Sequence, residues 1–330
     1  MSSLRLRFVG SLQAEHSTDR AVAGDAGVLL SLLKHNRVVA GVARRTAWAR
    51  NRGLERVIFT ATTGRSGTTT LTRLFAAVPS CRSLHEPWPP MSGEVLHAAS
   101  YGDVRFVREA FRRSKAVNIL RAAAGHRYYF EANHCFVKTF AELAAEEFGD
   151  RLAVVHLVRP AIEVAMSIFR LREEPGTNVG NFWWLDHRAP SNLIQIADLL
   201  DSDRLAHPFY KALWYWHEVE ARIAALRTRL PSLRMVRFET AELDDKDKVL
   251  RLFAELGIAC DPPQIEPLIG GILNQREEQK SLSPLPLAQA ESMLLRFHDA
   301  LARRGIELPI SPSAKAWVPA RELREPAVPA

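Results

Sequence analysis

A short apolar run that leads straight into a glycine turn is the feature that most constrains this chain. Residues 56–61 (RVIFTA) are rich in β-branched and aromatic side chains, as strands are, and helical apolar spacing begins at 71–78. Between them, Gly64 and Gly67 allow backbone torsions that side chains oppose. The order strand, turn, helix directs unpaired N–H groups and the positive end of a helix at one point, where anions bind. The segment therefore predicts a phosphate-binding turn.

The side chains of this turn also suit an oxyanion. Arg65 adds a fixed positive charge, and several neighbours carry hydroxyl groups. A Walker loop would have a lysine after its second glycine, but Thr68 follows Gly67 here, and no acidic strand end suited to magnesium is evident. Ordinary ATP or GTP hydrolysis is therefore disfavoured. We expect the anion to contact Gly64, Arg65, Ser66, Gly67, Thr68, Thr69 and Thr70.

Further strand-like and helix-like segments alternate along the chain. Such alternation implies a parallel sheet that is covered by helices on both faces. We therefore expect an α/β fold, a three-layer sandwich like that of P-loop proteins. The other expected strands are 128–132, 152–158 and 234–238, and the other expected helices are 104–114, 161–171, 208–229, 246–256 and 287–304.

Length and composition fit one elaborated domain, because 330 residues with 47% hydrophobic content can bury a large core. We divide the chain into an N-terminal helical extension (1–55), a main domain (56–308) and an extended proline-rich tail (309–330). Three cysteines without CxxC spacing indicate neither a zinc site nor disulfide bonds. No apolar stretch approaches ~18 residues and no signal sequence is evident, so we expect a cytoplasmic protein without a transmembrane segment.

Charge gives weaker information about partners. The formal net charge of +7 comes largely from arginine, which favours phosphate-rich ligands. Basic residues are scattered over the whole length without a recognised nucleic-acid motif, so we expect no nucleic-acid partner. The stretch 37–56 has the pattern of an amphipathic helix, and peripheral membrane contact stays open there, although a solvated helical face is the simpler interpretation. The oligomeric state is not encoded in these patterns.

A second basic element follows the expected strand 152–158. Arg159 stands at the end of that strand and Ser167 about two helical turns later, so both side chains can face one ligand. Together with the glycine turn, these residues make the sequence resemble the sulfotransferase superfamily over approximately residues 56–280. The phosphosulfate loop of that family reads basic residue, Ser, Gly, Thr, Thr. Residues 65–69 match this order, with arginine in place of the lysine common in cytosolic members.

The resemblance implies the donor 3'-phosphoadenosine 5'-phosphosulfate, with 3',5'-diphosphoadenosine as product and no metal. It makes residues 56–308 a sulfotransferase domain in which the turn holds the 5'-phosphosulfate, while Arg159 and Ser167 hold the 3'-phosphate. The segment 236–239 resembles a late strand of the family. Arg276 resembles a residue of the loop that closes over the 3'-phosphate, and a role elsewhere is an equal alternative for it.

Sulfuryl transfer needs a base for the proton of the acceptor and positive charge near the departing phosphate oxygen. Glu86 resembles the base of the carbohydrate and tyrosylprotein branches of the family. His134 resembles the histidine of the branch that acts on phenols and steroids, so both bases stay open. Lys138 or Arg65 would stabilise the leaving oxygen, and for Lys138 a solvated surface position is an equal alternative.

The acceptor side is less defined. Aromatic and polar residues between 175 and 190 suit sugars or phenols, although Trp183 and Trp184 serve equally well as anchors of a loop. We expect a hydroxyl or amine acceptor on a carbohydrate or a small metabolite. Two other functions stay open: a nucleotide kinase or hydrolase of P-loop type, and a non-catalytic module that binds anions or glycans.

Overall fold

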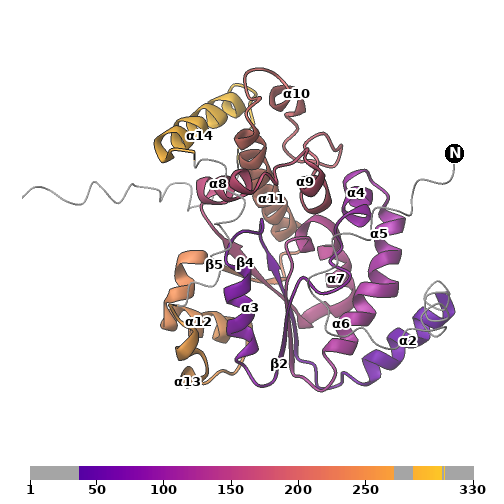
Figure 1. Cartoon of the computed structure of the whole chain (residues 1–330). Coiled ribbons are helices and arrows are strands. Elements are labelled where there is room, and N and C mark those ends of the chain that lie inside the picture. Colours follow the sequence, from indigo (N-terminus) through magenta and orange to yellow (C-terminus); the bar gives the residue numbers. More distant parts are fainter. Residues whose placement is uncertain (1–36, 271–284, 307, 309–330) are drawn as a thin grey trace, which may run out of the picture.

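Five parallel strands form the centre of the molecule, in the spatial order β2, β3, β1, β4, β5 (Figure 1). The computed structural model describes residues 37–270, 285–306 and 308. Helices flank the sheet on both faces, and the expected α/β class is therefore confirmed. The strands are β1 (Arg56–Ala61), β2 (Cys81–His85), β3 (Tyr128–Ala132), β4 (Leu152–Val158) and β5 (Arg234–Glu239).

Alternate side chains of the central strand enter two different cores. Phe59 of β1 belongs to one hydrophobic cluster and its neighbour Ile58 to the other, because successive strand residues point to opposite faces. Figure 1 shows a group of helices on each side of the sheet. One group is α3 (Thr68–Ala76), α12 (Lys246–Leu256) and α13 (Pro262–Ile265), and the other is α5 (Val104–Ala110), α6 (Ala116–Ala122) and α7 (Ala141–Phe148), with α2 (Arg37–Ala49) packed on α6.

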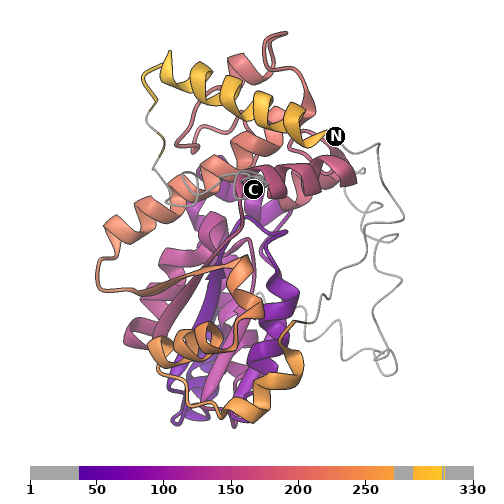
Figure 2. The ribbon, with the colours of Figure 1, turned by 90° about the vertical axis from the view of Figure 1, so that its left-hand side faces the viewer.

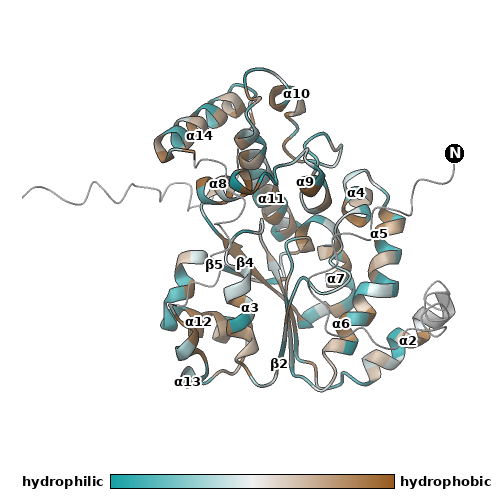
Figure 3. Ribbon diagram, in the orientation of Figure 1, coloured by the Kyte–Doolittle hydropathy of each residue, from teal (hydrophilic) through white to brown (hydrophobic). Residues whose placement is uncertain are grey.

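A further group of helices lies beyond one end of the sheet (Figure 2). The 22-residue helix α11 (Pro208–Arg229) packs against α8 (Ala161–Leu171) and α14 (Leu287–Ala302). Apolar residues gather where the helices face the interior (Figure 3). Within the described ranges no helix combines the length and the apolar character that crossing a bilayer requires. The remaining α-helices described are α4 (Glu94–Ser100), α9 (Asn178–Trp183) and α10 (Ala197–Leu200).

The expected strands and the helices 161–171, 208–229 and 246–256 are present. Sequence analysis missed β2, an edge strand of sequence CRSLH whose residues are mostly half-buried or exposed. An edge strand has one neighbour and tolerates polar side chains, so it lacks the apolar signal of a central strand. The expected helix 104–114 changes at Phe111 to a π-helix, η1 (Phe111–Lys115). The proposed tail from 309 and the extension before 37 lie outside the described residues, and the domain boundaries stay predictions.

A buried ion pair joins η1 to the sheet. Lys115 Nζ lies 2.6 Å from Glu131 Oε1, and both side chains are almost completely buried. Glu131 also accepts hydrogen bonds from the Tyr129 hydroxyl and the Asn133 amide, each at 2.7 Å. Lys115 Nζ donates to the carbonyl oxygen of Pro87 at 3.2 Å. The cation therefore connects η1, β3 and the segment that follows β2.

Replacing Lys115 with methionine should reduce the free energy of unfolding by ~3–5 kcal/mol, because the Glu131 carboxylate is then buried without a cation. Urea unfolding followed by circular dichroism measures the change. The double variant Lys115→Met, Glu131→Gln should recover much of the loss. As a control, Arg105→Met breaks the exposed pair with Glu109 and should have little effect. Equal losses of unfolding free energy in Lys115→Met and Arg105→Met would show that the buried pair is no more important than the exposed one.

Candidate functional site

The glycine turn connects β1 to α3 through a series of left-handed residues. Gly64, Arg65 and Gly67 have φ angles of 79°, 57° and 84°. Gly67 is the N-cap of α3, so the N–H groups of the first helical turn, which have no partner within the helix, lie directly after it. A Cβ atom on Gly67 would lie 2.7 Å from Leu243 Cδ1, so a side chain would displace its neighbour. The turn has the backbone geometry of an anion site.

Hydroxyl groups hold the turn in place from within. Thr63 and Ser66 both donate to the carbonyl oxygen of Gly64, at 2.9 and 3.0 Å. From outside, the Thr240 hydroxyl contacts the carbonyl oxygens of Ser66 and Val158 at 2.8 and 3.1 Å. The hydroxyl proton of Ser66, expected on an anion, is therefore used within the turn. Thr68, Thr69 and Thr70 are partly exposed at the start of α3, and their contact with an anion stays a prediction.

The second basic element lies directly against this turn. Arg159, just after β4, donates from Nη1 to the carbonyl oxygen of Arg65 at 2.8 Å. Arg65 Nε donates to the hydroxyl of Ser167 in α8 at 3.0 Å. The indole N–H of Trp216 in α11 donates to the Arg159 carbonyl at 2.9 Å and so fixes this strand end. The structure thus brings together the two elements that the sequence pairs, while Arg276 lies outside the described residues.

The two candidate bases are neighbours at the ends of adjacent strands. Glu86 follows β2 with a φ of 45°, and its Oε1 lies 3.4 Å from Nε2 of His134, which follows β3. The His134 side chain is 4% exposed and that of Glu86 is 25% exposed. His85 turns its ring toward the glycine turn, with Nε2 3.0 Å from the Thr68 hydroxyl. Of the two candidates, Glu86 is the more accessible.

Burial gives these groups unusual acidities. Burial raises the pKa of Glu86 to about 7, against the opposing effect of the Lys138 charge. Burial, together with the positive charge of Lys138, keeps the pKa of His134 well below its ordinary value. Burial also lowers the pKa of Lys138 to about 8. At neutral pH the imidazole is therefore uncharged, and the Glu86 carboxyl is close to its midpoint.

Lys138 is 3% exposed, which excludes the surface alternative for this residue. It belongs to the π-helix η2 (Phe136–Phe140). Its Nζ contacts His134 Nδ1 at 2.7 Å, the Trp183 carbonyl oxygen at 2.8 Å and the Tyr215 hydroxyl at 2.9 Å. An ammonium group has three hydrogens. The three contacts use all of them, so Lys138 does not reach toward a ligand in this arrangement.

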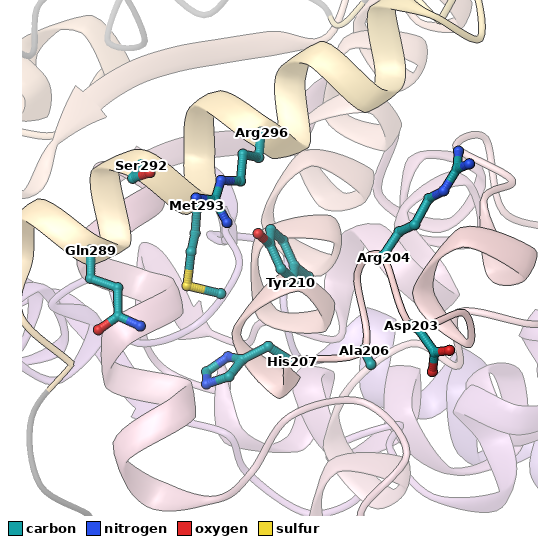
Figure 4. Close-up of a pocket in the computed structure, with 9 residues that line it drawn as sticks. All are labelled: Asp203, Arg204, Ala206, His207, Tyr210, Gln289, Ser292, Met293 and Arg296. Atoms are coloured by element: carbon teal, nitrogen blue, oxygen red, sulfur yellow. The ribbon is translucent and has the colours of Figure 1, made fainter.

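A separate hollow of about 300 Å³ lies between α11 and α14. Figure 4 shows Tyr210 of α11 facing Met293 and Arg296 of α14 across it. None of the residues singled out in the sequence lines this hollow. The geometry described above therefore belongs to a different part of the molecule.

Three residues with clear positions around the site escaped sequence analysis. The sequence did contain a signal for Thr240. Thr240 is the first residue of a short 3₁₀ turn, η4 (Thr240–Asp244), and the capping box of this turn, formed by Glu239 and Glu242, comes directly at the end of β5. Tyr215 and Lys115 had none, since each stands in an ordinary helical pattern and meets its partners only through tertiary contacts.

Comparison with known proteins finds similarity to solved structures only. No protein-family model matches the chain, and no curated protein does. The sulfotransferase domain from the Synechococcus PCC 7002 olefin synthase is 17% identical with a TM-score of 0.42, over 77% of this chain and 95% of that one. The sulfotransferase domain from the curacin biosynthetic pathway is 15% identical with a TM-score of 0.43, over 78% and 99%. Sulfotransferase STF1 from Mycobacterium tuberculosis H37Rv is 14% identical with a TM-score of 0.44, over 83% and 86%.

All three structures are sulfotransferases, and the sequence resembles the sulfotransferase superfamily. Identities and TM-scores this low do not decide an activity. The functional argument therefore rests on the geometry of this chain.

The tight fit of the glycine turn can be measured with a matched pair of variants. Gly67 and Gly102 have φ angles of 84° and 85°, but a Cβ on Gly102 would meet nothing within 4 Å. Gly102→Ala should therefore lose only the ~1–2 kcal/mol of a left-handed alanine. Gly67→Ala should lose an additional ~1–3 kcal/mol from the clash with Leu243, as measured by urea unfolding. Equal losses would show that the turn is not confined by η4.

Proposed function

We propose that this protein is a sulfotransferase that moves the sulfuryl group of 3'-phosphoadenosine 5'-phosphosulfate to a hydroxyl or amine. The observation that carries the proposal is the direct contact between the glycine turn and the Arg159 and Ser167 element. One small molecule with a phosphate group at each end would touch both. Residues 56–308 would form this catalytic domain.

The residues around the turn fit such a donor. Arg65 and Arg159 supply two guanidinium groups beside the N-terminus of α3, a combination suited to several phosphate oxygens. Several buried side-chain atoms of the described residues have no hydrogen-bond partner, and the hydroxyl of Thr62 and the indole N–H of Trp184 are among them. Trp184 lies against the turn, since a Cβ on Gly64 would come within 3.2 Å of its ring. Unpaired polar groups of this kind are expected where a ligand binds.

The donor, when bound, supplies an activated sulfuryl group and a phosphate leaving group. Glu86 would take the proton of the acceptor as the new bond to sulfur forms, since a pKa of about 7 suits a base at neutral pH. The Arg65 guanidinium would stabilise the electron pair left on the phosphate oxygen. His134 is less suited to the role of base because it is almost fully buried, and burial keeps its pKa well below the ordinary histidine value.

The acceptor would approach past exposed aromatic side chains. Trp88, two residues after Glu86, is 71% exposed, and Phe182 of α9 is 46% exposed. The Phe182 carbonyl accepts a hydrogen bond from the N–H of Gly93 at 2.8 Å, which holds α9 beside the segment that follows β2. Exposed rings beside a polar site suit the apolar face of a sugar or a small aromatic metabolite. We infer an acceptor of that class, in the cytoplasm.

Calorimetry with 3',5'-diphosphoadenosine and with ADP tests the donor. We expect the diphosphate with its 3'-phosphate to bind at least about 10-fold more tightly, since charge-assisted hydrogen bonds contribute ~1.5–3 kcal/mol. Arg159→Met should remove most of this preference. Arg82→Met, an exposed change on the edge strand β2, is the matched control and should preserve it. Equal affinity for both nucleotides, or none for either, would refute the donor assignment and revive the kinase and binding-module alternatives.

Glu86→Gln should preserve affinity for 3',5'-diphosphoadenosine and reduce kcat by roughly 10²- to 10⁴-fold, the usual contribution of a general base. The assay is transfer of radiolabelled sulfate to a panel of sugars, phenols and small amines. In the unmodified protein, kcat/KM should rise with pH through about 7, because the base works only when Glu86 is deprotonated. Turnover that is unchanged in the variant would remove Glu86 from this role.

A further inference from the structure

A continuous series of buried polar contacts connects the glycine turn to the side chain of Glu86. The Tyr215 hydroxyl donates to the carbonyl oxygen of Thr63 at 2.8 Å and contacts Lys138 Nζ at 2.9 Å. Lys138 Nζ contacts His134 Nδ1 at 2.7 Å, and His134 Nε2 lies 3.4 Å from Glu86 Oε1. Tyr215, Lys138 and His134 are all buried. The series spans the distance between the phosphate site and the candidate base.

The direction of each contact follows from the chemistry of the groups. The Tyr215 hydroxyl uses its only hydrogen on Thr63, so its oxygen accepts from Lys138. An ammonium group has no acceptor, so charged Lys138 also donates to His134 Nδ1. A neutral imidazole whose Nδ1 accepts must carry its hydrogen on Nε2. That N–H faces the carboxylate of Glu86.

We propose that Lys138 and Tyr215 are positioning residues that hold His134 as its Nε2–H tautomer, so that His134 orients the Glu86 carboxylate. The inference rests on the proposed sulfuryl transfer, in which Glu86 is the base. It also assigns His134 a role that differs from catalysis as a base, because neither ring nitrogen has a free lone pair. The contact of 3.4 Å is slightly longer than a usual hydrogen bond, and such contacts often shorten when substrate binds.

Packing around His134 restricts the ring. Its centroid lies 5.6 Å from that of Trp183 and 4.8 Å from that of Trp184. Lys138 Nζ lies 5.2 Å from the ring centroids of Trp184 and Tyr215, which favours its charged form in this buried place. A flip of the imidazole would bring a carbon atom to Lys138 and leave one of the three ammonium hydrogens without an acceptor, since the other two are bonded to Trp183 and Tyr215. The neighbours therefore fix both the orientation and the protonation of the ring.

The charge of Lys138 also acts on Glu86 through space. Burial raises the pKa of this carboxyl, and the Lys138 charge is the largest opposing influence. Loss of the charge should raise the pKa of Glu86 further and, because the same charge lowers the pKa of His134, let the imidazole take up a proton more easily. The titratable groups that act on Glu86 are Lys138, Glu131, Lys115, Arg65, His134, Cys135 and Tyr215, and those around His134 are Lys138, His85, Glu86 and Cys135, whose Sγ lies 3.9 Å from His134 Nδ1.

Nitrogen-15 NMR of the histidine rings tests the tautomer without donor or acceptor, so its outcome is independent of whether sulfate is transferred. His134→Gln identifies the signal among the 11 histidines. At pH 7 the His134 ring of the unmodified protein should be the Nε2–H tautomer alone. In Lys138→Met the ring should be a mixture of the two neutral tautomers, and it should become protonated at a higher pH than in the unmodified protein. An Nδ1–H or imidazolium form in the unmodified protein, or an unchanged signal in folded Lys138→Met, would overturn the inference.

Steady-state kinetics gives the second measurement. Lys138→Met should lower kcat by about 10-fold or more. It should also move the rise of kcat/KM to a higher pH, by at least about half a pH unit. Its affinity for 3',5'-diphosphoadenosine should be nearly unchanged. Tyr215→Phe keeps the ring and should give a smaller loss, so it replaces Lys138→Met if that variant does not fold. Lys211→Met is the control on α11, the helix of Tyr215. It removes a charge paired with Asp201 and should change neither kcat nor the pH at which kcat/KM rises. A rising limb that stays in place in a folded variant would refute the positioning role.

Discussion

Parallel strands have all their carboxyl ends at one edge of the sheet, and the whole candidate site depends on that constraint. Each strand delivers its contribution within a few residues of its own end. Residues far apart in the chain therefore meet without long loops, on backbone that the sheet holds rigid. The glycine turn follows β1, Glu86 follows β2, His134 follows β3, Arg159 follows β4 and Thr240 follows β5.

Two opposing electrostatic effects meet at Glu86. Burial favours the neutral carboxyl, whereas nearby cations favour the carboxylate, and burial is the larger effect because the pKa is raised. Lys115 has its charge neutralised by Glu131, but Lys138 donates to neutral groups only. A cation that keeps all its hydrogen bonds but lacks a counterion is costly, which agrees with the lowered pKa of Lys138. That uncompensated charge still acts on Glu86.

Sequence patterns predict those parts of the site that are encoded locally. The turn at 62–70 combines glycines, hydroxyls and a cation between a strand and a helix, and Arg159 with Ser167 has a spacing visible on one strand and one helix. The role of Tyr215 had no such signal, because its hydroxyl reaches Thr63 from a helix 152 residues away. His134 and Lys138 are an intermediate case. Their separation of four residues predicts proximity only if the chain turns helically after β3, and His134 does lie in the turn that leads into η2, which contains Lys138.

Both buried lysines near Glu86 stand in π-helical segments, Lys115 in η1 and Lys138 in η2. The wider hydrogen-bond spacing of a π-helix changes the direction of the side chains that follow it, and such segments are frequent at functional sites. Lys115 reaches the carbonyl of Pro87, directly after Glu86, and Lys138 reaches His134, on which the carboxylate rests. The two irregular segments thus place one cation at the carbonyl of the residue after the candidate base and the other at the imidazole that its carboxylate contacts. A regular α-helix would change the direction of both lysines relative to the sheet, so we infer that the π-helices are part of how this fold controls the charge of Glu86.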